Sequence, residues 1–395
     1  MPLSFPTGST VGELYKEGTK SWTWNGSAWD RVDPSEAPTG DTPPSVAVVG
    51  NTWFNTTNGK MYYFDDSEMW IQVSGTPLTA DQRPDFSADG HSTTATEAML
   101  HGGTNQNGNN DKNSVDKFNF AGSDATYHGT LANNLKMHGS ASSGTSVFAV
   151  SGSNGVAILG NVQKIDFATN FTAAAHGALS TYTHNQTTTQ DAVQLMNAGG
   201  IYTGTRTTFV EKMAFATGSS AVPHGDLTSA RSVSSAGSDG YQALQVGGNA
   251  GPGNGGRLNK IEKLNFGYNA VSVEVDQLVA EKSNQFAASD SVDLMTGCGV
   301  DASAILLQTR QKISFATGAE NTSFADAILA MQDRKACSDG TEAFIAGGTQ
   351  ASGLYNRAWK YNFSSMAQTA NFAATGWGGV DPLNRTTHAQ SSGGA

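Results

Sequence analysis

An all-β fold is predicted by three features of the composition. Glycine is abundant, with 46 residues in 395, where ~7% is average. Charged residues make up only 14% of the chain, where ~25% is ordinary, and Ser, Thr, Asn and Gln take their place. Hydrophobic residues, at 37%, are enough to fill a core. Long helices would need more Glu, Lys, Leu and Arg, so we expect many short strands joined by glycine-containing turns.

The first 76 residues predict two small β modules, residues 1–37 and 38–76. Aromatic residues alternate around an Asn-Gly pair in WTWNGSAW (22–29) and follow one in TTNGKMYYF (56–64). Asn-Gly supplies the positive φ values that a tight hairpin turn requires, so each string predicts a hairpin. A linker with four prolines, residues 33–45, lies between them.

Five of the seven tryptophans lie in these modules. Modules of this size are marginally stable alone and have little interior in which to bury large rings. Aromatic side chains are enriched in protein–protein contacts, so we expect these five to attach the protein to a partner. The alternative is that they form two small cores. They are Trp22, Trp24, Trp29, Trp53 and Trp70.

The remainder of the chain, residues 77–395, contains a repeat. One marker is a lysine followed by an apolar residue, any residue and phenylalanine. A second marker is a short apolar strand that ends in glycine. Both markers recur with a period near 49 residues, which is strong evidence for six copies. The marker lysines are Lys117, Lys164, Lys212, Lys263, Lys312 and Lys360, and the marker glycines are Gly102, Gly152, Gly199, Gly247, Gly297 and Gly347.

A leucine that precedes a polar stretch is a third marker of each copy. Four short strands then fit into each period, which is typical of a propeller blade. We therefore predict a six-bladed β-propeller. Because an open ring leaves an unpaired sheet edge, a strand near residues 385–392 or one near residues 83–90 is expected to complete the first blade. The leucines are Leu131, Leu179, Leu227, Leu278 and Leu329, with Leu78 and Leu383 at the two ends.

The repeat resembles the Kelch family of β-propellers. The resemblance covers residues 78–395 and rests on the glycine pair, the loop after it and the Lys-apolar-x-Phe strand. Two departures are visible. The tryptophan that the family usually has in its fourth strand is absent, and the glycine pair is degenerate at Ser151-Gly152 and Gly297-Cys298-Gly299. The resemblance implies a propeller with binding loops on a rigid scaffold.

The six marker lysines have two interpretations. They are either a ring that binds an anion or a feature copied with the blade. Alternation places Ile165 and Phe167 on one face of the strand and Lys164 on the other. We favour the second interpretation, in which each lysine stem covers apolar surface while its ammonium reaches water.

No metal, cofactor or catalytic group is predicted. The eight histidines are scattered without the i, i+2 or i, i+4 spacing of a metal motif, and no Ser-His-Asp context or phosphate-binding loop is present. Kelch-like copper oxidases would need a Tyr–Cys pair with histidines near the axis. Cys298 and Cys337 are instead expected to be small buried thiols.

Asparagine-rich loops follow two of the glycine pairs, in residues 103–114 and 248–259. They lack the acidic spacing of a calcium loop. Loops on a rigid scaffold often carry binding residues, so we expect these to face a host surface. The candidate residues are Asn105, Asn107, Asn109, Asn110, Asn249 and Asn254.

Charge and hydropathy exclude two classes of partner. The formal net charge is −11 and no basic patch is apparent, so binding to nucleic acid is not expected. No apolar run approaches the ~20 residues of a membrane-spanning helix. The N-terminus lacks the pattern of a secretory signal, which is consistent with assembly in a cytoplasm.

The N-terminal modules resemble those common in structural proteins of tailed bacteriophages, especially those of cyanobacteria and other marine hosts. The strings that carry this resemblance are WTWNGSAWDRV (22–32) and VGNTWFNTTNGKMYYFDDSEMWIQVS (49–74). It implies a virion protein that contacts other virion proteins, forms a homo-oligomer in the particle and recognises a host surface glycan or protein.

Three functions remain open at this point. The leading one is a tail-associated fibre or adhesin whose propeller faces the host while residues 1–76 attach it to the particle. The second is a capsid-bound fibre or decoration protein of the same architecture. The third is an enzyme acting on surface polysaccharide, which would require a carboxylate pair or a metal in a cleft.

Overall fold

The structure is a computed structural model in which the chain divides into two compact units, Met1–Arg83 and Pro84–Ala395. The residues described in full are 95–104, 112–122, 125–169, 172–252, 256–267, 271–320, 327, 329–350 and 358–368. Elsewhere the description covers the backbone of the strands named below, together with the side chains of Trp53 and Tyr62.

Both units are built from β-strands, and the described residues include no α-helix. A helix able to cross a membrane is accordingly not found among them. The all-β prediction is confirmed. The physical reason for the all-β fold is that the chain is rich in glycine, threonine and other β-branched residues and poor in the charged residues that favour helices.

The first unit contains two small sheets. One has the order β1–β2–β3 and the other the order β4–β5–β6–β7. The predicted hairpins are present: β2 pairs antiparallel with β3, so that Trp24 lies opposite Trp29, and β5 pairs antiparallel with β6, so that Trp53 lies opposite Tyr62. The strands are β1 (Leu14–Glu17), β2 (Lys20–Trp24), β3 (Trp29–Val32), β4 (Thr39–Gly40), β5 (Thr52–Asn55), β6 (Lys60–Phe64) and β7 (Trp70–Gln72).

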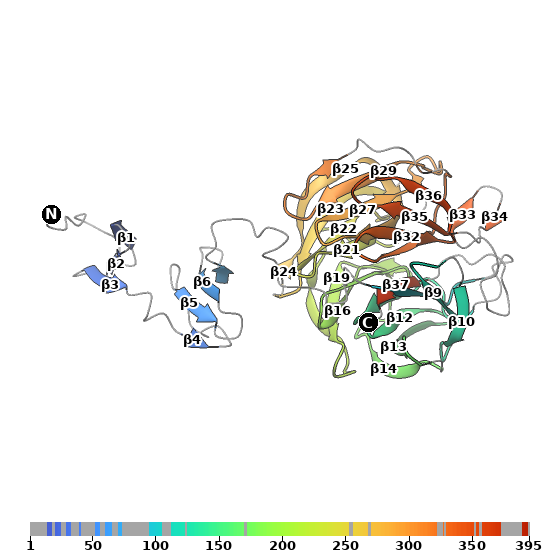
Figure 1. Cartoon of the computed structure of the whole chain (residues 1–395), viewed down its shortest axis with the longest axis horizontal. Coiled ribbons are helices and arrows are strands. Elements are labelled where there is room, and N and C mark those ends of the chain that lie inside the picture. The colour runs from blue at the N-terminus through green and yellow to red at the C-terminus, as the bar shows by residue number, and fades with distance from the viewer. Residues whose placement is uncertain are drawn as a thin grey trace. The chain divides into compact units, whose positions relative to one another are not determined.

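The second unit contains six sheets of at least four strands each (Figure 1). The first sheet consists of β37 (Ala389–Gly393), β8 (Glu97–His101), β9 (Ser114–Asn119) and β10 (Ala125–Thr130). The second consists of β11 (Gly139–Ser142), β12 (Ser146–Ser153), β13 (Ile158–Asp166) and β14 (Ala174–Ala178). The third consists of β15 (Thr187–Gln190), β16 (Gln194–Ala198), β19 (Phe209–Ala214), β20 (Val222–Asp226) and β24 (Ala270–Val271).

The other three sheets repeat this arrangement. The fourth consists of β21 (Ser235–Ser238), β22 (Gln242–Val246), β23 (Leu258–Asn265), β25 (Val273–Ser283) and β28 (Val300–Asp301). The fifth consists of β26 (Phe286–Ser289), β27 (Asp293–Gly297), β29 (Arg310–Ser314) and β30 (Glu320–Asn321). The sixth consists of β31 (Lys335–Ser338), β32 (Glu342–Ala346), β35 (Ala358–Asn362) and β36 (Gln368–Phe372). Two short hairpins, β17 (Ile201–Tyr202) with β18 (Thr205–Arg206) and β33 (Thr349–Gln350) with β34 (Gly353–Leu354), lie outside these sheets.

The C-terminal strand belongs to the first sheet. β37 pairs antiparallel with β8, and Ser391 lies opposite Met99. The first sheet is therefore assembled from both ends of the second unit. Of the two strands that the sequence suggested for this role, the one near residues 385–392 is in place, whereas residues 83–90 lie outside the described part of the chain.

The first strands of the six sheets are neighbours in a closed order. β37 contacts β11, which contacts β15, and the order continues through β21, β26 and β31 back to β37. We call these six the inner strands. Each sheet extends from its inner strand through successive antiparallel neighbours, and the third sheet ends in the parallel pair β20–β24.

The hydrophobic core is divided between neighbouring sheets. Six clusters of buried residues occur among the described side chains, and each joins one sheet to the next. In the cluster between the sixth and first sheets, Phe120 stacks on Phe344 with ring centroids 4.0 Å apart. The marker phenylalanines occupy these interfaces because alternation along the strand turns them away from the marker lysines.

The second residue of each glycine pair is glycine in all six copies, and it has positive φ. A Cβ at Gly299 would lie 2.6 Å from the carbonyl oxygen of Ser283, and one at Gly348 would lie 2.8 Å from that of Gln332. The first position tolerates Ser151 and Cys298, at φ of 50° and 58°. The degenerate copies thus retain the glycine at the position where a backbone approaches.

The marker lysines differ from the prediction that their ammonium groups simply reach water. The Nζ atoms of Lys117 and Lys312 donate to the carbonyls of Phe167 and Phe363 at 3.1 and 3.2 Å. Lys212 and Lys360 make the same kind of bond, to Phe266 and Phe120. Each bond joins one sheet to the next, because the accepting phenylalanine directly follows a strand of the neighbouring sheet.

Leu329 is not equivalent to the other marker leucines, contrary to the prediction. The N–H groups of Leu131 and Leu227 donate to the carbonyls of Asn113 and Thr208, and the equivalent bond in the copy before β31 is made by Ala327 to Gln308. Leu329 therefore lies two residues after the equivalent position, where it packs, partly buried, against the core between the fifth and sixth sheets.

Candidate functional site

A channel runs between the inner strands. It consists of three adjoining cavities of about 30, 70 and 80 Å³, which share lining residues. We call it the central channel. Its described walls are β11, β15, β21, β26 and β31 and the residues directly before them, so that five repeats contribute equivalent positions to a single site.

At one end of the channel, a series of backbone hydrogen bonds links five residues from successive repeats. The N–H of Asn185 donates to the carbonyl of Met137, and the N–H of Val233 donates to that of Asn185. In the same way Asn284 donates to Val233 and Asp333 donates to Asn284, all at 2.8–2.9 Å. All five residues have φ between 50° and 59°. Such values are rare for a β-branched residue such as Val233, so the backbone at that position is strained.

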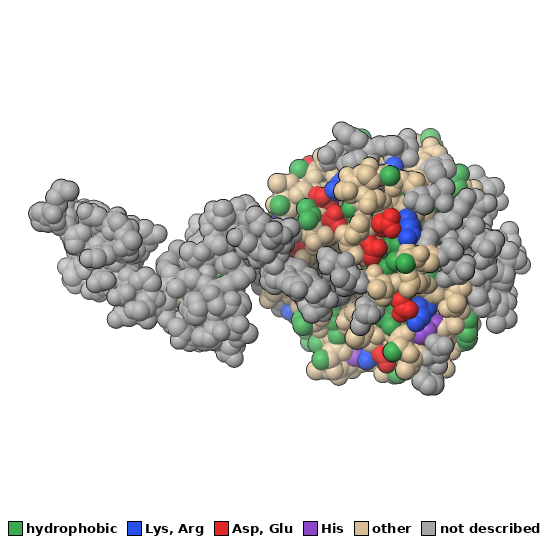
Figure 2. All heavy atoms as spheres, viewed as in Figure 1, with side chains coloured by type: hydrophobic (Ala, Val, Ile, Leu, Met, Phe, Trp, Pro, Cys, Tyr) green, Lys and Arg blue, Asp and Glu red, His purple; other side chains and the backbone are tan. Residues whose placement is uncertain are grey.

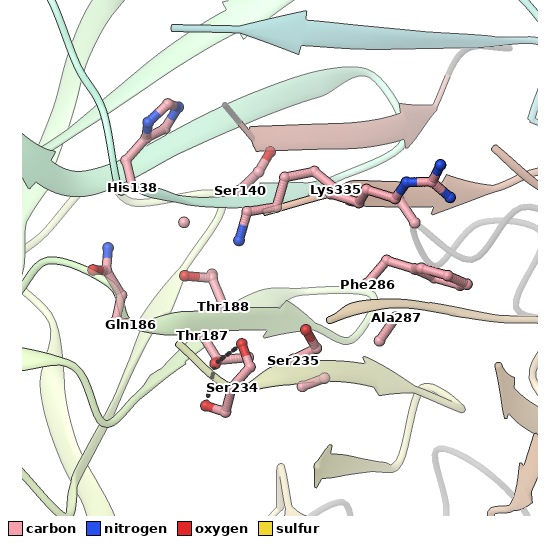
Figure 3. Close-up of a pocket in the computed structure, with 14 residues that line it drawn as sticks. His138, Ser140, Gln186, Thr187, Thr188, Ser234, Ser235, Phe286, Ala287 and Lys335 are labelled. Atoms are coloured by element: carbon pink, nitrogen blue, oxygen red, sulfur yellow. Dashed lines mark hydrogen bonds between the residues drawn. The ribbon is translucent and has the colours of Figure 1, made fainter. Parts of the chain in front are cut away.

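Most side chains that line the channel are neutral and polar, and many bond to one another. Thr187 and Ser234 share a hydrogen bond of 2.7 Å across neighbouring inner strands (Figure 3). Gln186 donates from Nε2 to the carbonyl of Val150, and Gln285 donates in the same way to Val246. These bonds fix each inner strand on the sheet before it.

A pair of histidines lies beside the channel. His138 Nε2 is 3.0 Å from His101 Nδ1, and His101 Nε2 is 2.9 Å from the hydroxyl of Ser140. Between the two rings one nitrogen donates and the other accepts. Gly102 makes room for this contact, since a Cβ there would lie 2.5 Å from His138 Cε1.

Lys335 places an ammonium in the channel. Figure 3 shows this side chain pointing into the cavity, on the side where His138, Gln186 and Thr188 lie. Burial lowers the pKa of Lys335, and Asp333 opposes that shift. The carboxylate of Asp333 accepts from the amide of Asn284, and burial raises its pKa. No ion pair between these two residues is found in the described part of the chain.

Arg334 lines the channel but directs its guanidinium between the fifth and sixth sheets. There it lies over the ring of Trp359, 4.3 Å from the centroid. Its nitrogens contact sulfur atoms, those of Cys298 at 3.6 Å and Met331 at 2.6 Å. Cys298 is fully buried, and burial raises the pKa of its thiol. Cys298 and Cys337 are both buried, as predicted.

The aromatic residues proposed for attachment are placed as follows. Trp53 is 4% exposed, and its ring centroid lies 5.1 Å from that of Tyr62. The backbone of Trp22 and Trp24 lies in β2, that of Trp29 in β3 and that of Trp70 in β7; their side chains lie outside the described residues. Trp53 thus forms part of a small core, while the role of the other four in attachment stays a prediction.

The asparagines proposed to face a host are only partly described. Asn249 is 9% exposed, and its side chain accepts a hydrogen bond from the N–H of Gly251 at 3.0 Å. It therefore shapes its own loop. Asn105, Asn107, Asn109, Asn110 and Asn254 lie outside the described residues.

The channel offers binding groups more readily than hydrolytic ones. Among the channel-lining residues that the structure describes, Asp333 is the one carboxylate. Within the same described ranges, no group of three His, Cys, Asp or Glu residues is arranged to hold a metal ion. The arrangement can hold a small polar or anionic group by hydrogen bonds and one positive charge.

No protein-family model matches the chain, and no curated protein matches it in sequence.

Sequence reasoning did not find the channel residues. His101 and His138 are 37 residues apart, and Lys335 follows no motif. A signal was nevertheless present, because Lys335 begins its inner strand where the other described copies begin with Gly139, Thr187, Ser235 and Phe286. Comparison of the copies shows that only this one places a charge there.

Proposed function

We propose that this protein is a structural component of a tailed-bacteriophage virion, a tail-associated fibre or adhesin. In this proposal the second unit is a six-bladed, Kelch-like β-propeller that faces the host surface, and the first unit attaches the protein to the particle. The observation that carries the proposal is the pairing of an aromatic hairpin unit, which resembles phage modules, with a separate unit of six repeated sheets.

Three features support a propeller. The inner strands are neighbours in a closed order, a hydrophobic cluster joins each sheet to the next, and the last strand of the chain pairs within the first sheet. Because the C-terminal strand β37 pairs with β8, the edge of β8 is not left unpaired where the two ends of the unit meet. It is a rigid scaffold on which exposed loops can recognise a partner.

The surface of the second unit suits an exposed particle. Figure 2 shows small groups of acidic and basic side chains among neutral polar ones on one face of this unit. Three ion pairs among the described residues of this unit combine a marker lysine with a carboxylate on the neighbouring strand, such as Lys312 with Asp293 at 2.7 Å. Neutral polar surfaces respond weakly to salt, because screening acts on exposed charges.

The test separates the two units. Fragments 1–83 and 84–395 are added to particles that lack the protein, and each fragment that binds is measured after sedimentation. We expect fragment 1–83 to bind and fragment 84–395 to remain in solution, whereas the second fragment alone should bind host cells. Binding of the particle by fragment 84–395 and not by fragment 1–83 would contradict the assignment.

A location experiment distinguishes tail from capsid. A gold label on a C-terminal tag of the full-length protein is expected at the tail in electron micrographs. Label on the capsid would instead support a capsid-bound fibre or decoration protein. Release of sugar from host polysaccharide by the purified full-length protein would support the enzyme class.

A further inference from the structure

We propose that the central channel binds a compact oxyanion, such as sulfate, phosphate or a carboxylate group, on the ammonium of Lys335. This site does not depend on the virion role, because it is argued only from the residues of the channel.

The first argument is the lack of a close partner for Lys335. No hydrogen bond or ion pair of its ammonium occurs among the residues that the structure describes. The marker lysines Lys117, Lys312 and Lys360, in contrast, each have both a carboxylate and a backbone carbonyl. Lys335 is partly buried and its ammonium faces the cavity, where a cation without a close protein partner can attract an external anion.

The second argument is the position of the charge. The other described inner strands begin with neutral residues, Gly139, Thr187, Ser235 and Phe286. The repeat itself therefore does not need a lysine here. Asp333, the nearest carboxylate in the sequence, is already bonded to Asn284.

The third argument is the size and chemistry of the cavity. Its volume is about 70 Å³, several times the ~10–15 Å³ that one water needs, which leaves room for a tetrahedral or planar oxyanion. Ser140 in β11, Thr188 in β15 and Ser234 directly before β21 place hydroxyl groups around it.

The experiment measures binding of radiolabelled sulfate to the full-length protein by equilibrium dialysis in a buffer without other oxyanions. We expect saturable binding of one sulfate per chain. Lys335→Met is expected to weaken it at least about tenfold, which corresponds to about 1.4 kcal/mol. Lys164→Met is the matched control, because Lys164 is half-exposed and paired with Asp166; this variant should bind sulfate as the wild type does.

Competitors identify the source of the anion. Displacement of sulfate by glucuronate but not by glucose would indicate the acid group of a sugar, and displacement by phosphate alone would indicate a free inorganic anion. Absence of saturable binding, equal affinity in Lys335→Met, or equally strong displacement by chloride would overturn the proposal. Lys335→Gln, which retains a polar side chain, provides the same comparison if the methionine variant does not fold.

Discussion

Lys360, in the last repeat, donates a hydrogen bond to the backbone carbonyl of Phe120, which lies 240 residues earlier in the first repeat. The same ammonium lies 3.2 Å from a carboxylate oxygen of Glu342 and 4.7 Å from the ring centroid of Phe344. The joint between the two ends of the second unit therefore uses the bond that Lys117, Lys212 and Lys312 make between internal neighbours.

Lys360→Met is expected to lower the free energy of unfolding by about 1–2 kcal/mol. The substitution retains much of the stem but removes a bond from a charged donor, and such bonds contribute about 1.5–3 kcal/mol. Lys360 is 14% exposed, so water replaces the lost partner incompletely. Urea unfolding at neutral pH measures the change.

Lys164→Met is the control for this substitution. Lys164 pairs with Asp166 at 3.3 Å while both side chains are largely exposed, and exposed pairs contribute less than about 1 kcal/mol. Equal losses in the two variants would show that the bond to Phe120 does not stabilise the joint.

Deletion of residues 383–395 is expected to cause association of the protein and a lower melting temperature. The deletion removes β37, which exposes the edge of β8 along Glu97–His101, and an exposed edge strand recruits other chains. Size-exclusion chromatography with light scattering detects the larger species. Truncation after Gly393 is the control and should remain monodisperse; the same result for the long deletion would place closure elsewhere, near residues 83–90.

Arg231→Thr is expected to destabilise the protein by about 3–5 kcal/mol at pH 7. Arg231 and Glu262 are both fully buried and paired, and removal of one partner leaves the other as an uncompensated charge. Glu262 also accepts hydrogen bonds from Thr228 and Ser272. Adding Glu262→Gln should recover part of the loss, because the amide retains the acceptor without the charge.

The preceding repeat explains the choice of threonine. At the positions equivalent to Arg231 and Glu262 it has Thr183 and Glu211, and burial raises the pKa of Glu211. In Arg231→Thr, burial should raise the pKa of Glu262 in the same way. A raised carboxyl pKa leaves stability present at low pH and lost as pH rises through the folded value. The loss in Arg231→Thr should therefore be smaller at pH 5 than at pH 7, and a loss independent of pH would contradict this account.

Lys282 is expected to make stability rise with pH between about 8 and 10.5. Burial lowers the pKa of Lys282 from 10.5 to about 8, so over this window the unfolded chain binds a proton that the folded chain has released. The shift corresponds to about 3 kcal/mol of destabilisation below pH 8. Lys282→Met should thus unfold at higher urea concentration than the wild type at pH 7, with a difference that shrinks toward pH 10.5.

Lys212→Met is the control for that pH series. Lys212 donates to the carbonyl of Phe266 and is only partly buried. Its removal should destabilise the protein slightly. The difference in stability between the wild type and Lys212→Met should not change between pH 8 and 10.5 as it does for Lys282→Met. A Lys282→Met difference that does not change with pH would indicate that packing, not charge, determines its effect.

Periodicity in the sequence was sufficient to predict the strands of the second unit. Alternation along each Lys-apolar-x-Phe strand places the phenylalanine on the face opposite the lysine. Phe167 and its counterpart Phe120 were therefore expected to face away from the lysines, and both are buried. The Asn-Gly pairs likewise predicted the two hairpins, whereas the pairing of Trp24 with Trp29 is known from the structure. These are local properties, because alternation and turn chemistry depend on residues adjacent in the chain.

Contacts between distant residues were not predictable in this way. His101 meets His138 because two neighbouring sheets are brought together, and Arg231 meets Glu262 because the segment before β21 lies close to β23 of the same sheet. Nothing in the spacing of either pair indicates the contact. The sequence by itself therefore determined the repeats, the strands and the buried phenylalanines. The tertiary structure decided which terminus completes the first sheet, where the marker lysines bond, and that Lys335 stands in the central channel, because each of these depends on which sheets become neighbours.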